Sequence, residues 1–175
     1  MFGEKGLVQL YTGDGKGKTT AALGLLLRAA GHGARTAVVQ FMKGSDIYGE
    51  IKMLEQMTNV TLVRTGRTKC IFKGEETQED FDEALRGIEA ARRFISSGEF
   101  DLVILDEVNV ATDFGLINPE DVINIIKGKA RNTEVVLTGR NAPQDFIEAA
   151  DLISEMKEIK HPWRSGVTAR KGVEY

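Results

Sequence analysis

The sequence predicts an α/β fold of three layers, with helices on both faces of a mostly parallel β-sheet. Two observations carry this prediction. Short apolar segments typical of buried strands alternate along the chain with longer amphipathic segments typical of helices. The first of these strands runs into a glycine-rich turn, and a helical pattern starts directly after it. With 175 residues and 42% hydrophobic content, we expect one globular nucleotide-binding domain over residues 1–159 and a tail over 160–175 that packs on or near its active site.

Composition narrows the class of protein. The net charge of −3 gives no overall attraction to nucleic acid. The single cysteine, Cys70, excludes an internal disulfide and a cysteine-based zinc site, which suits a reducing compartment. No secretory signal and no apolar segment long enough to span a bilayer is visible. We therefore expect a cytoplasmic protein that binds neither nucleic acid nor membrane.

The glycine-rich turn lies within residues 7–20, LVQLYTGDGKGKTT. Its closely spaced glycines let the backbone wrap tightly and aim successive N–H groups inward. The helix that follows presents the positive end of its dipole, Lys18 adds a point charge, and the Thr19 hydroxyl suits a magnesium ion bound to phosphate. Thr12 stands where the strict P-loop pattern has glycine. The residues expected to hold a polyphosphate are Gly13, Asp14, Gly15, Lys16, Gly17, Lys18, Thr19 and Thr20.

The helices are predicted from apolar periodicity and from their ends. They are expected at residues 18–30, 47–57, 78–97, 118–129 and 144–150. Glycines follow the first and third of these, and Asn118 with Pro119 makes a favourable start for the fourth. The apolar face of the first helix comprises Ala22, Leu25, Leu26 and Ala29. That of the longest helix comprises Phe81, Ala84, Leu85, Ile88, Ala91 and Ile95.

The later strands are short and largely apolar, and are expected at residues 36–41, 60–64, 101–107, 134–138 and 152–159. Open parallel sheets bind ligands at the carboxyl ends of their strands. The loop at residues 43–45 leaves the carboxyl end of the strand expected at 36–41. Asp106 and Glu107 end the most apolar strand, the place where P-loop proteins hold Mg²⁺. An ideal strand points these two carboxylates to opposite faces, which predicts different roles for them. Arg140 follows another strand and could reach phosphate or sugar oxygens, or instead form a surface salt bridge.

Two segments lack periodicity. Residues 65–77, TGRTKCIFKGEET, mix basic and apolar side chains, which suits a ligand with both anionic and apolar surfaces; the alternative is a mobile surface loop. The tail, KHPWRSGVTARKGVEY, is expected to be neither helical nor strand-like. Trp163 and Val167 suggest that part of it packs on something, and His161 is either a ligand or a turn residue.

The whole chain resembles the cob(I)alamin adenosyltransferases of the corrinoid-salvage type. The resemblance rests on YTGDGKGKTT at 11–20, VQFMKG at 39–44, ETQ at 76–78, LDE at 105–107, TGR at 138–140, and the tail with Lys160-His161 and a final GVEY. It implies a RecA-like P-loop fold, a homodimer, and transfer of the 5′-deoxyadenosyl group of ATP to the Co(I) of a reduced corrinoid with release of tripolyphosphate. It also implies Mg²⁺ and a flavoprotein that supplies the electron for cobalt reduction.

The resemblance assigns roles to individual residues. Lys18, Thr19 and Glu107 would be catalytic, Thr19 and Glu107 would lie near the metal, and Arg28 and Arg140 would lie near the nucleotide. Phe72 and Thr77 would face the corrinoid. Relatives carry a Phe-x-Trp pair just before the ETQ motif, whereas this chain has Phe72 one residue earlier and Glu75 at the tryptophan position.

Two other functions use the same phosphate-binding turn. A nucleoside or small-molecule kinase would direct its acceptor to the γ-phosphorus and would need a base, for which Asp106 or Glu107 could serve. A regulatory nucleotide-binding switch would bind ATP without turnover. Adenosyl transfer needs no protein nucleophile, because Co(I) itself attacks the ribose C5′.

Overall fold

The computed structural model describes residues 5–175 and contains a six-stranded sheet with every pair of neighbouring strands parallel. The strand order is β3-β2-β4-β5-β1-β6. The strands are β1 (Val8–Thr12), β2 (Thr36–Gln40), β3 (Val60–Arg64), β4 (Leu102–Asp106), β5 (Glu134–Thr138) and β6 (Leu152–Glu155). The helices are α1 (Lys18–Gly31), α2 (Gly49–Leu54), α3 (Gln78–Ser97), α4 (Val108–Asp113), α5 (Pro119–Lys127) and α6 (Gln144–Ala149).

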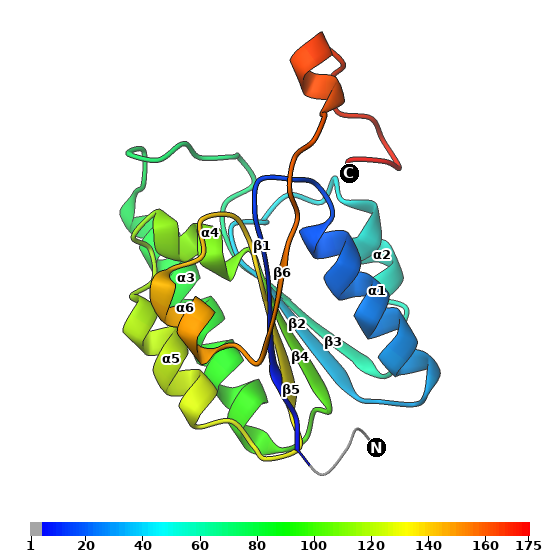
Figure 1. Ribbon diagram of the computed structural model, residues 1–175, viewed down its shortest axis with the longest axis vertical. Helices are drawn as coiled ribbons and strands as arrows, with labels where there is room; N and C mark the ends of the chain where they lie inside the picture. The colour runs from blue at the N-terminus through cyan, green and yellow to red at the C-terminus, as the bar shows by residue number, and fades with distance from the viewer. Residues whose placement is uncertain (1–4) are drawn as a thin grey trace.

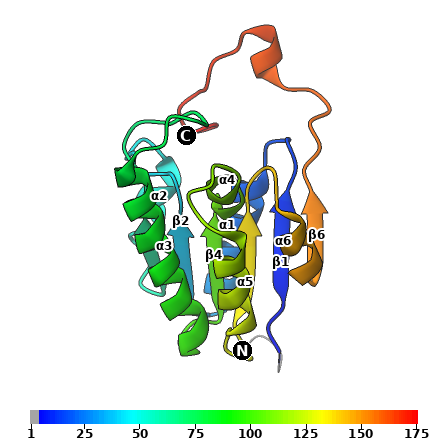
Figure 2. The same ribbon diagram turned by 90° about the vertical axis from the view of Figure 1, so that its left-hand side faces the viewer.

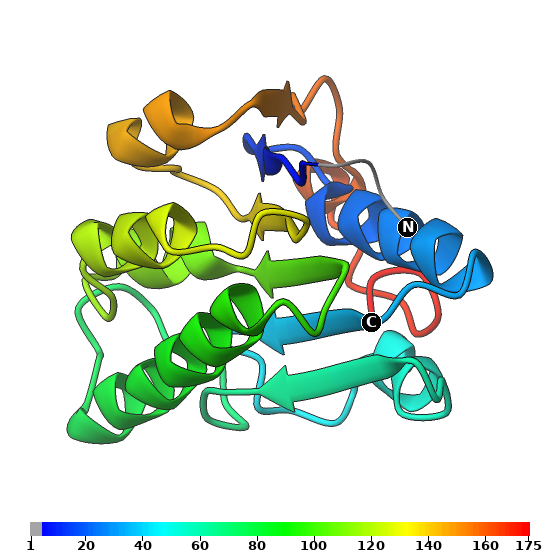
Figure 3. The same cartoon turned by 90° about the horizontal axis from the view of Figure 1, so that it is seen from below.

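Helices cover both faces of the sheet, as Figure 1 shows, so the predicted three-layer α/β fold is confirmed. Helix α1 and helix α2 lie on one face, and α3, α4, α5 and α6 lie on the other (Figures 1 and 3). Alternate residues of each central strand feed two separate apolar clusters, one on each face. In β4, for example, Leu102 and Ile104 pack toward α1, whereas Val103 and Leu105 pack toward α3. No helix within residues 5–175 is long and apolar enough to cross a membrane.

All six strands point the same way, so their carboxyl ends meet at one edge of the sheet. Figure 2 shows that the tail arches over this edge. Strand β5 lies between β1, which leads into the glycine-rich turn, and β4, which ends in Asp106. The turn and Asp106 are therefore two strands apart, and α1 spans the interval on one face of the sheet.

Several predicted boundaries were wrong. Helix α2 covers only Gly49–Leu54 of the expected 47–57, and α4 was not predicted. Strand β6 ends at Glu155, four residues early, because its neighbour β1 ends at Thr12 and the next residue, Met156, turns across the glycine-rich loop. There the Met156 carbonyl accepts from the Gly15 N–H at 2.6 Å.

The predicted buried face of α3 was also partly wrong. Phe81 and Leu85 are exposed, whereas Gly87 and Phe94 are buried. A Cβ at Gly87 would lie 2.4 Å from the ring of Phe41. Because the Phe41 ring packs against Gly87, the buried face of α3 is rotated relative to the face that its apolar residues alone predict. The tail, expected to be irregular, contains one 3₁₀ turn at Pro162–Ser165, for which His161 provides an N-cap.

Candidate functional site

The glycine-rich turn between β1 and α1 has the backbone shape expected of a phosphate-binding loop. Gly13 and Gly17 adopt φ of 94° and 124°, values that side chains with a Cβ strongly disfavour. Gly15 lies so close to the chain at Met156 that a Cβ would sit 2.6 Å from its carbonyl oxygen. The loop is thus held from behind by the segment that follows β6, and α1 starts directly at Lys18.

Lys18 is buried inside this loop. Its Nζ donates to the Gly13 carbonyl at 2.6 Å and to the Gly15 carbonyl at 2.8 Å. Burial and the nearby Arg140 guanidinium lower the pKa of Lys18 from its ordinary value. The ammonium is therefore close to the loop and short of anionic partners, a state that a phosphate group would relieve.

A row of polar residues ends three neighbouring strands at this edge. Gln40 of β2 is in register with Asp106 of β4, and Leu105 with Leu137 of β5, which places Thr138 beside Asp106. These residues follow apolar side chains of the α1 face at two-residue intervals, so they face the first turn of α1. All three are buried, and the sheet hydrogen bonds fix their positions.

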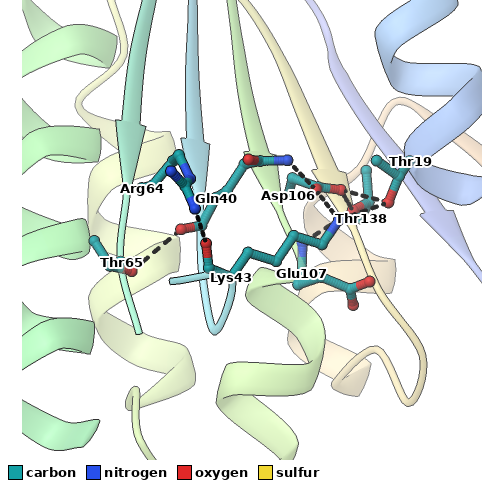
Figure 4. Close-up of polar contacts among 8 residues, drawn as sticks. All are labelled: Thr19, Gln40, Lys43, Arg64, Thr65, Asp106, Glu107 and Thr138. Carbon is teal, nitrogen blue, oxygen red and sulfur yellow. Dashed lines mark hydrogen bonds and ion pairs between the residues drawn. The ribbon is translucent and has the colours of Figure 1, made fainter. Parts of the chain in front are cut away.

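Asp106 is the centre of a hydrogen-bonded group, drawn in Figure 4. One carboxylate oxygen, Oδ1, accepts from Thr19 Oγ1 at 2.8 Å and from Thr138 Oγ1 at 2.7 Å. The other, Oδ2, accepts from Gln40 Nε2 at 3.2 Å and from Lys43 Nζ at 2.7 Å. Burial opposes ionisation of Asp106, but Lys43 and the hydroxyl donors outweigh it, and the pKa of this carboxyl falls below its ordinary value. Asp106 is an anion that four side chains hold in place.

Glu107 differs from its neighbour in both position and electrostatics. It lies just after β4 with a φ of 62°, so the prediction that the two carboxylates occupy opposite faces of one strand was wrong. Its backbone N–H donates to Thr138 Oγ1 at 3.0 Å, while Figure 4 shows its carboxylate apart from the group around Asp106. Burial and the Asp106 charge raise the pKa of Glu107. Its carboxylate lines the cavity described next.

A cavity of about 920 Å³ opens over the strand ends. That volume matches the pockets that hold nucleotide-sized ligands. Residues 15–20 of the loop form one wall, and Lys43, Tyr48, Glu107 and Arg140 contribute charged or polar groups. The helix α4, which the sequence did not predict, adds Val110 and Asp113. Arg28, by contrast, is exposed in the last turn of α1 and does not line this cavity.

The end of the tail lines the same cavity. Lys16 Nζ donates to the Val173 carbonyl and to Glu174 Oε1, both at 3.0 Å. Arg170 also pairs with Glu174, and these two cations hold the pKa of Glu174 at about 2. The last four residues, 172–175, therefore lie against the lysine-bearing tip of the loop.

The segment 65–77 lies beside the cavity rather than in its wall. Lys73 Nζ contacts Asp113 Oδ1 at 2.9 Å, which ties the segment to α4. Thr77 caps α3 through a mutual contact with Asp80, and Phe72 is 72% exposed. No contact in the described chain explains so exposed a phenylalanine.

The residues around Thr19 suit a hard cation, although within residues 5–175 no three or more His, Cys, Asp or Glu side chains are grouped so that they could hold a metal ion by themselves. A hydroxyl and carboxylates are the donors that Mg²⁺ prefers when phosphate oxygens and water complete its shell. Here the ammonium of Lys43 lies 2.7 Å from Asp106 Oδ2 and 3.4 Å from Thr19 Oγ1. A cation already sits where these oxygens converge, so the site fits a metal ion.

Sequence reasoning placed the loop and both carboxylates at one edge but assigned no role to Gln40, Lys43, Tyr48 or Thr138. One signal could have found two of them. Gln40 and Thr138 are polar residues that follow a run of apolar residues and end their strands, as Asp106 does in β4. Lys43 belongs to the segment VQFMKG at 39–44, but the direction of its side chain follows from the turn after β2.

Comparisons with known proteins show which family this chain resembles. The model of a family described as ATP:corrinoid adenosyltransferase BtuR/CobO/CobP matches residues 4–175. A corrinoid adenosyltransferase of Sinorhizobium sp. is 41% identical over 174 residues, covering 98% of this chain and 81% of the relative. Corrinoid adenosyltransferases of Pseudomonas aeruginosa and Escherichia coli K12 are 33% and 34% identical, each over 98% of this chain and over 85% and 87% of the relative.

Proposed function

Since the chain belongs to the ATP:corrinoid adenosyltransferase family, we propose that its cavity binds ATP with the triphosphate on residues 13–20 and the ribose C5′ toward the corrinoid. The reaction of this family moves the 5′-deoxyadenosyl group of ATP to the cobalt of a reduced corrinoid. The cobalt(I) electron pair forms the Co–C5′ bond, and the C5′–O bond breaks with its electron pair on the released tripolyphosphate. The observation that carries the assignment of roles is the buried Lys18 in a loop that faces the Asp106 group.

The protein's main electrostatic task is to stabilise the leaving group. Negative charge on the triphosphate increases as the C5′–O bond breaks, so donors fixed in advance lower the barrier. The backbone N–H groups of the loop, Lys18 and Lys16 supply such donors on one side. Arg140 and Lys43, which also line the cavity, supply positive charge on the other. No protein nucleophile or general base is needed.

A magnesium ion is the expected partner of the triphosphate. Thr19 and Glu107 were predicted from the sequence to hold it, and we add Asp106 because that carboxylate contacts the Thr19 hydroxyl directly. When bound, the ion would neutralise part of the charge on the leaving group. These residues would orient the ion beside the triphosphate.

The tail and the segment 65–77 are proposed to enclose the reacting centre. Attack by cobalt(I) requires C5′ to be positioned in line and shielded from water. Glu174 and Val173 lie on Lys16, which supports a role for the tail as a cover over the triphosphate. We assign Phe72 and Thr77 to the corrinoid side, as the resemblance implies; the exposure of Phe72 supports this assignment.

Two further features rest on the resemblance alone: we propose that the protein acts as a homodimer and that a flavoprotein supplies the electron that reduces cobalt(II). We also propose that it works in the cytoplasm, which the single cysteine, Cys70, supports. No role for nucleic acid or membrane is proposed.

The products of the reaction test this function. The protein is incubated anaerobically with ATP, Mg²⁺ and chemically reduced cobalamin, and the phosphate products are separated by ion-exchange chromatography. We expect tripolyphosphate and a light-sensitive alkylcobalamin in equal amounts, and neither without the corrinoid. ADP together with a phosphorylated acceptor would instead identify a kinase, and ATP binding without turnover would identify a nucleotide-binding switch.

A further inference from the structure

Lys43 makes contacts that the leaving-group role does not explain. It is largely buried, and its ammonium contacts Asp106 and the Thr19 hydroxyl, two of the three groups that we assign to the metal. The ring of Tyr48 lies 5.4 Å from the same Nζ, on the cavity side. The Lys43 side chain thus forms a largely buried ion pair with Asp106 in the unliganded protein.

The turn that carries Lys43 is fixed by contacts unrelated to nucleotide binding. The Lys43 backbone N–H donates to the Thr65 carbonyl at 2.8 Å, and the Lys43 carbonyl accepts from Arg64 Nη2 at 3.3 Å. The next residue, Gly44, packs so tightly that a Cβ would lie 2.0 Å from the Gly66 carbonyl oxygen. Figure 4 shows the side chain extended from this turn toward Asp106. The backbone is anchored, so the side chain alone can move.

We propose that Lys43 is the protein's own cation at the metal position, and that it gives up this position only when the triphosphate offers it another anion. This inference rests on the proposed function, since it requires ATP and a metal ion to bind in this cavity. Two cations cannot share one buried carboxylate at low cost, because each would be repelled by the other in a medium of low dielectric. Lys43 already lines the cavity beside Tyr48, so a rotation of its side chain brings the ammonium to the triphosphate.

The consequence is that metal and nucleotide bind together. Without nucleotide, a displaced Lys43 would be a partly desolvated charge with no new partner, so free metal binds weakly. With nucleotide, the triphosphate receives the ammonium and the metal at once. Lys43 is thus a positioning residue for the empty site and part of the leaving-group grip in the loaded one.

Binding of Mn²⁺ alone, measured by electron paramagnetic resonance without nucleotide or corrinoid, tests this inference. Lys43→Met should raise the affinity for Mn²⁺ at least tenfold over the unaltered protein. The double variant Lys43→Met with Asp106→Asn should lose that gain. Lys73→Met is the matched control, because it removes a lysine beside the same cavity that pairs with Asp113 instead. Equal Mn²⁺ affinity in Lys43→Met and the unaltered protein would overturn the proposal.

A second measurement does not depend on whether Lys43→Met folds. In protein labelled with ¹⁵N-lysine, the Lys43 ammonium signal is assigned by its loss in Lys43→Arg, which keeps the charge. We expect this signal to stay in place when Mg²⁺ alone is added, and to shift or disappear with Mg²⁺ and ATP together. A signal that moves with Mg²⁺ alone, or that ATP with Mg²⁺ leaves unchanged, contradicts the proposal. Neither measurement involves adenosyl transfer, so the proposed function fails separately, in the assay for tripolyphosphate.

Discussion

The two sides of the cavity are built in opposite ways. On the phosphate side, residues 13–20 with the Asp106 group, Lys18 and Asp106 are buried, and their hydrogen bonds to the loop carbonyls, Thr19 and Lys43 are 2.6–2.8 Å long. The outer side, residues 65–77 with the tail, is mostly exposed and held by surface ion pairs such as Lys73–Asp113 and Lys16–Glu174. Exposed ion pairs contribute little to stability, whereas buried ones fix geometry strongly.

This difference matches the two ligands that we assign. Charge develops on the triphosphate, and fixed dipoles and charges stabilise developing charge best when they need no rearrangement. A corrinoid is large and partly apolar, and a surface that closes on it gains from apolar side chains such as Phe72. The contrast therefore predicts that changes on the phosphate side alter catalysis and stability greatly, and that changes on the outer side alter binding moderately.

Loss of Lys18 should have the largest effect on activity. Lys18→Ala removes the cation at the centre of the loop, and we expect kcat to fall by about a hundredfold to a thousandfold, as for other fixed donors to a developing charge. Circular dichroism and thermal melting should show a folded protein, because Lys18 contacts only two carbonyls. Lys52→Ala, at an exposed position of α2, is the control. Retained turnover would show that the triphosphate does not lie on this loop.

The next largest effect concerns stability. Asp106→Asn keeps the shape of the side chain but leaves the Lys43 ammonium buried without its anion. We expect the free energy of unfolding in urea to fall by about 3–5 kcal/mol. Asp46→Asn removes an exposed partner of Arg64 and should change it by less than about 1 kcal/mol. Equal effects in the two variants would mean that the phosphate side is no more rigid than the surface.

The dependence of stability on pH should separate the same two carboxylates. Because the folded protein lowers the pKa of Asp106, its contribution is complete above the ordinary value of about 3.9 and is lost as the pH falls through the lower folded value. The free energy of unfolding should therefore decrease on acidification through this range, and less steeply in Asp106→Asn. Glu107, whose pKa is raised, acts in the opposite sense and at higher pH: between its raised folded value and its ordinary value of about 4.3 it adds stability as the pH falls, and Glu107→Gln should remove that gain. Parallel curves for all three proteins would contradict the pairing of Asp106.

On the outer side, Phe72→Ala should weaken corrinoid binding. Covering an exposed phenylalanine contributes about 1.5–3 kcal/mol, so we expect the KM for the corrinoid to rise by about ten- to a hundredfold while the KM for ATP stays unchanged. Leu27→Ala, an exposed apolar residue of α1, is the control and should change neither value. A change confined to the KM for ATP would remove Phe72 from the corrinoid side.

The smallest effect is expected from the tail. Glu174→Gln breaks the contacts with Lys16 and Arg170, which frees Lys16 for the triphosphate. These pairs are exposed, so equilibrium dialysis should show ATP binding tightened by no more than about fivefold. Glu158→Gln, which releases Arg164 elsewhere in the tail, should leave ATP affinity as it was. Weaker ATP binding in Glu174→Gln would mean that the tail assists rather than competes.

The sequence by itself determined the fold class and the phosphate side. Glycine spacing, the lysine and threonine that open α1, and the carboxylate that ends β4 are local patterns, and a parallel sheet brings strand ends together whatever the strand order. The predicted boundaries of β2, β3, β4 and β5 agreed with the structure to within a residue or two. A run of apolar residues is also a local pattern, which explains this agreement.

Only the tertiary structure decided which side chains meet. The partnership of Gln40, Asp106 and Thr138 depends on the register of three strands that are distant in sequence, and that of Thr19 with Asp106 on the packing of α1 against the sheet. The orientation of Lys43 depends on the contacts of its backbone with Arg64 and Thr65. The orientation of Glu107 depends on its own left-handed backbone conformation directly after β4. The turn of Met156 onto Gly15 has no local signal at all, because it exists only where β6 lies beside β1. Periodicity records which residues are buried, but the partner of each buried polar group is a long-range choice.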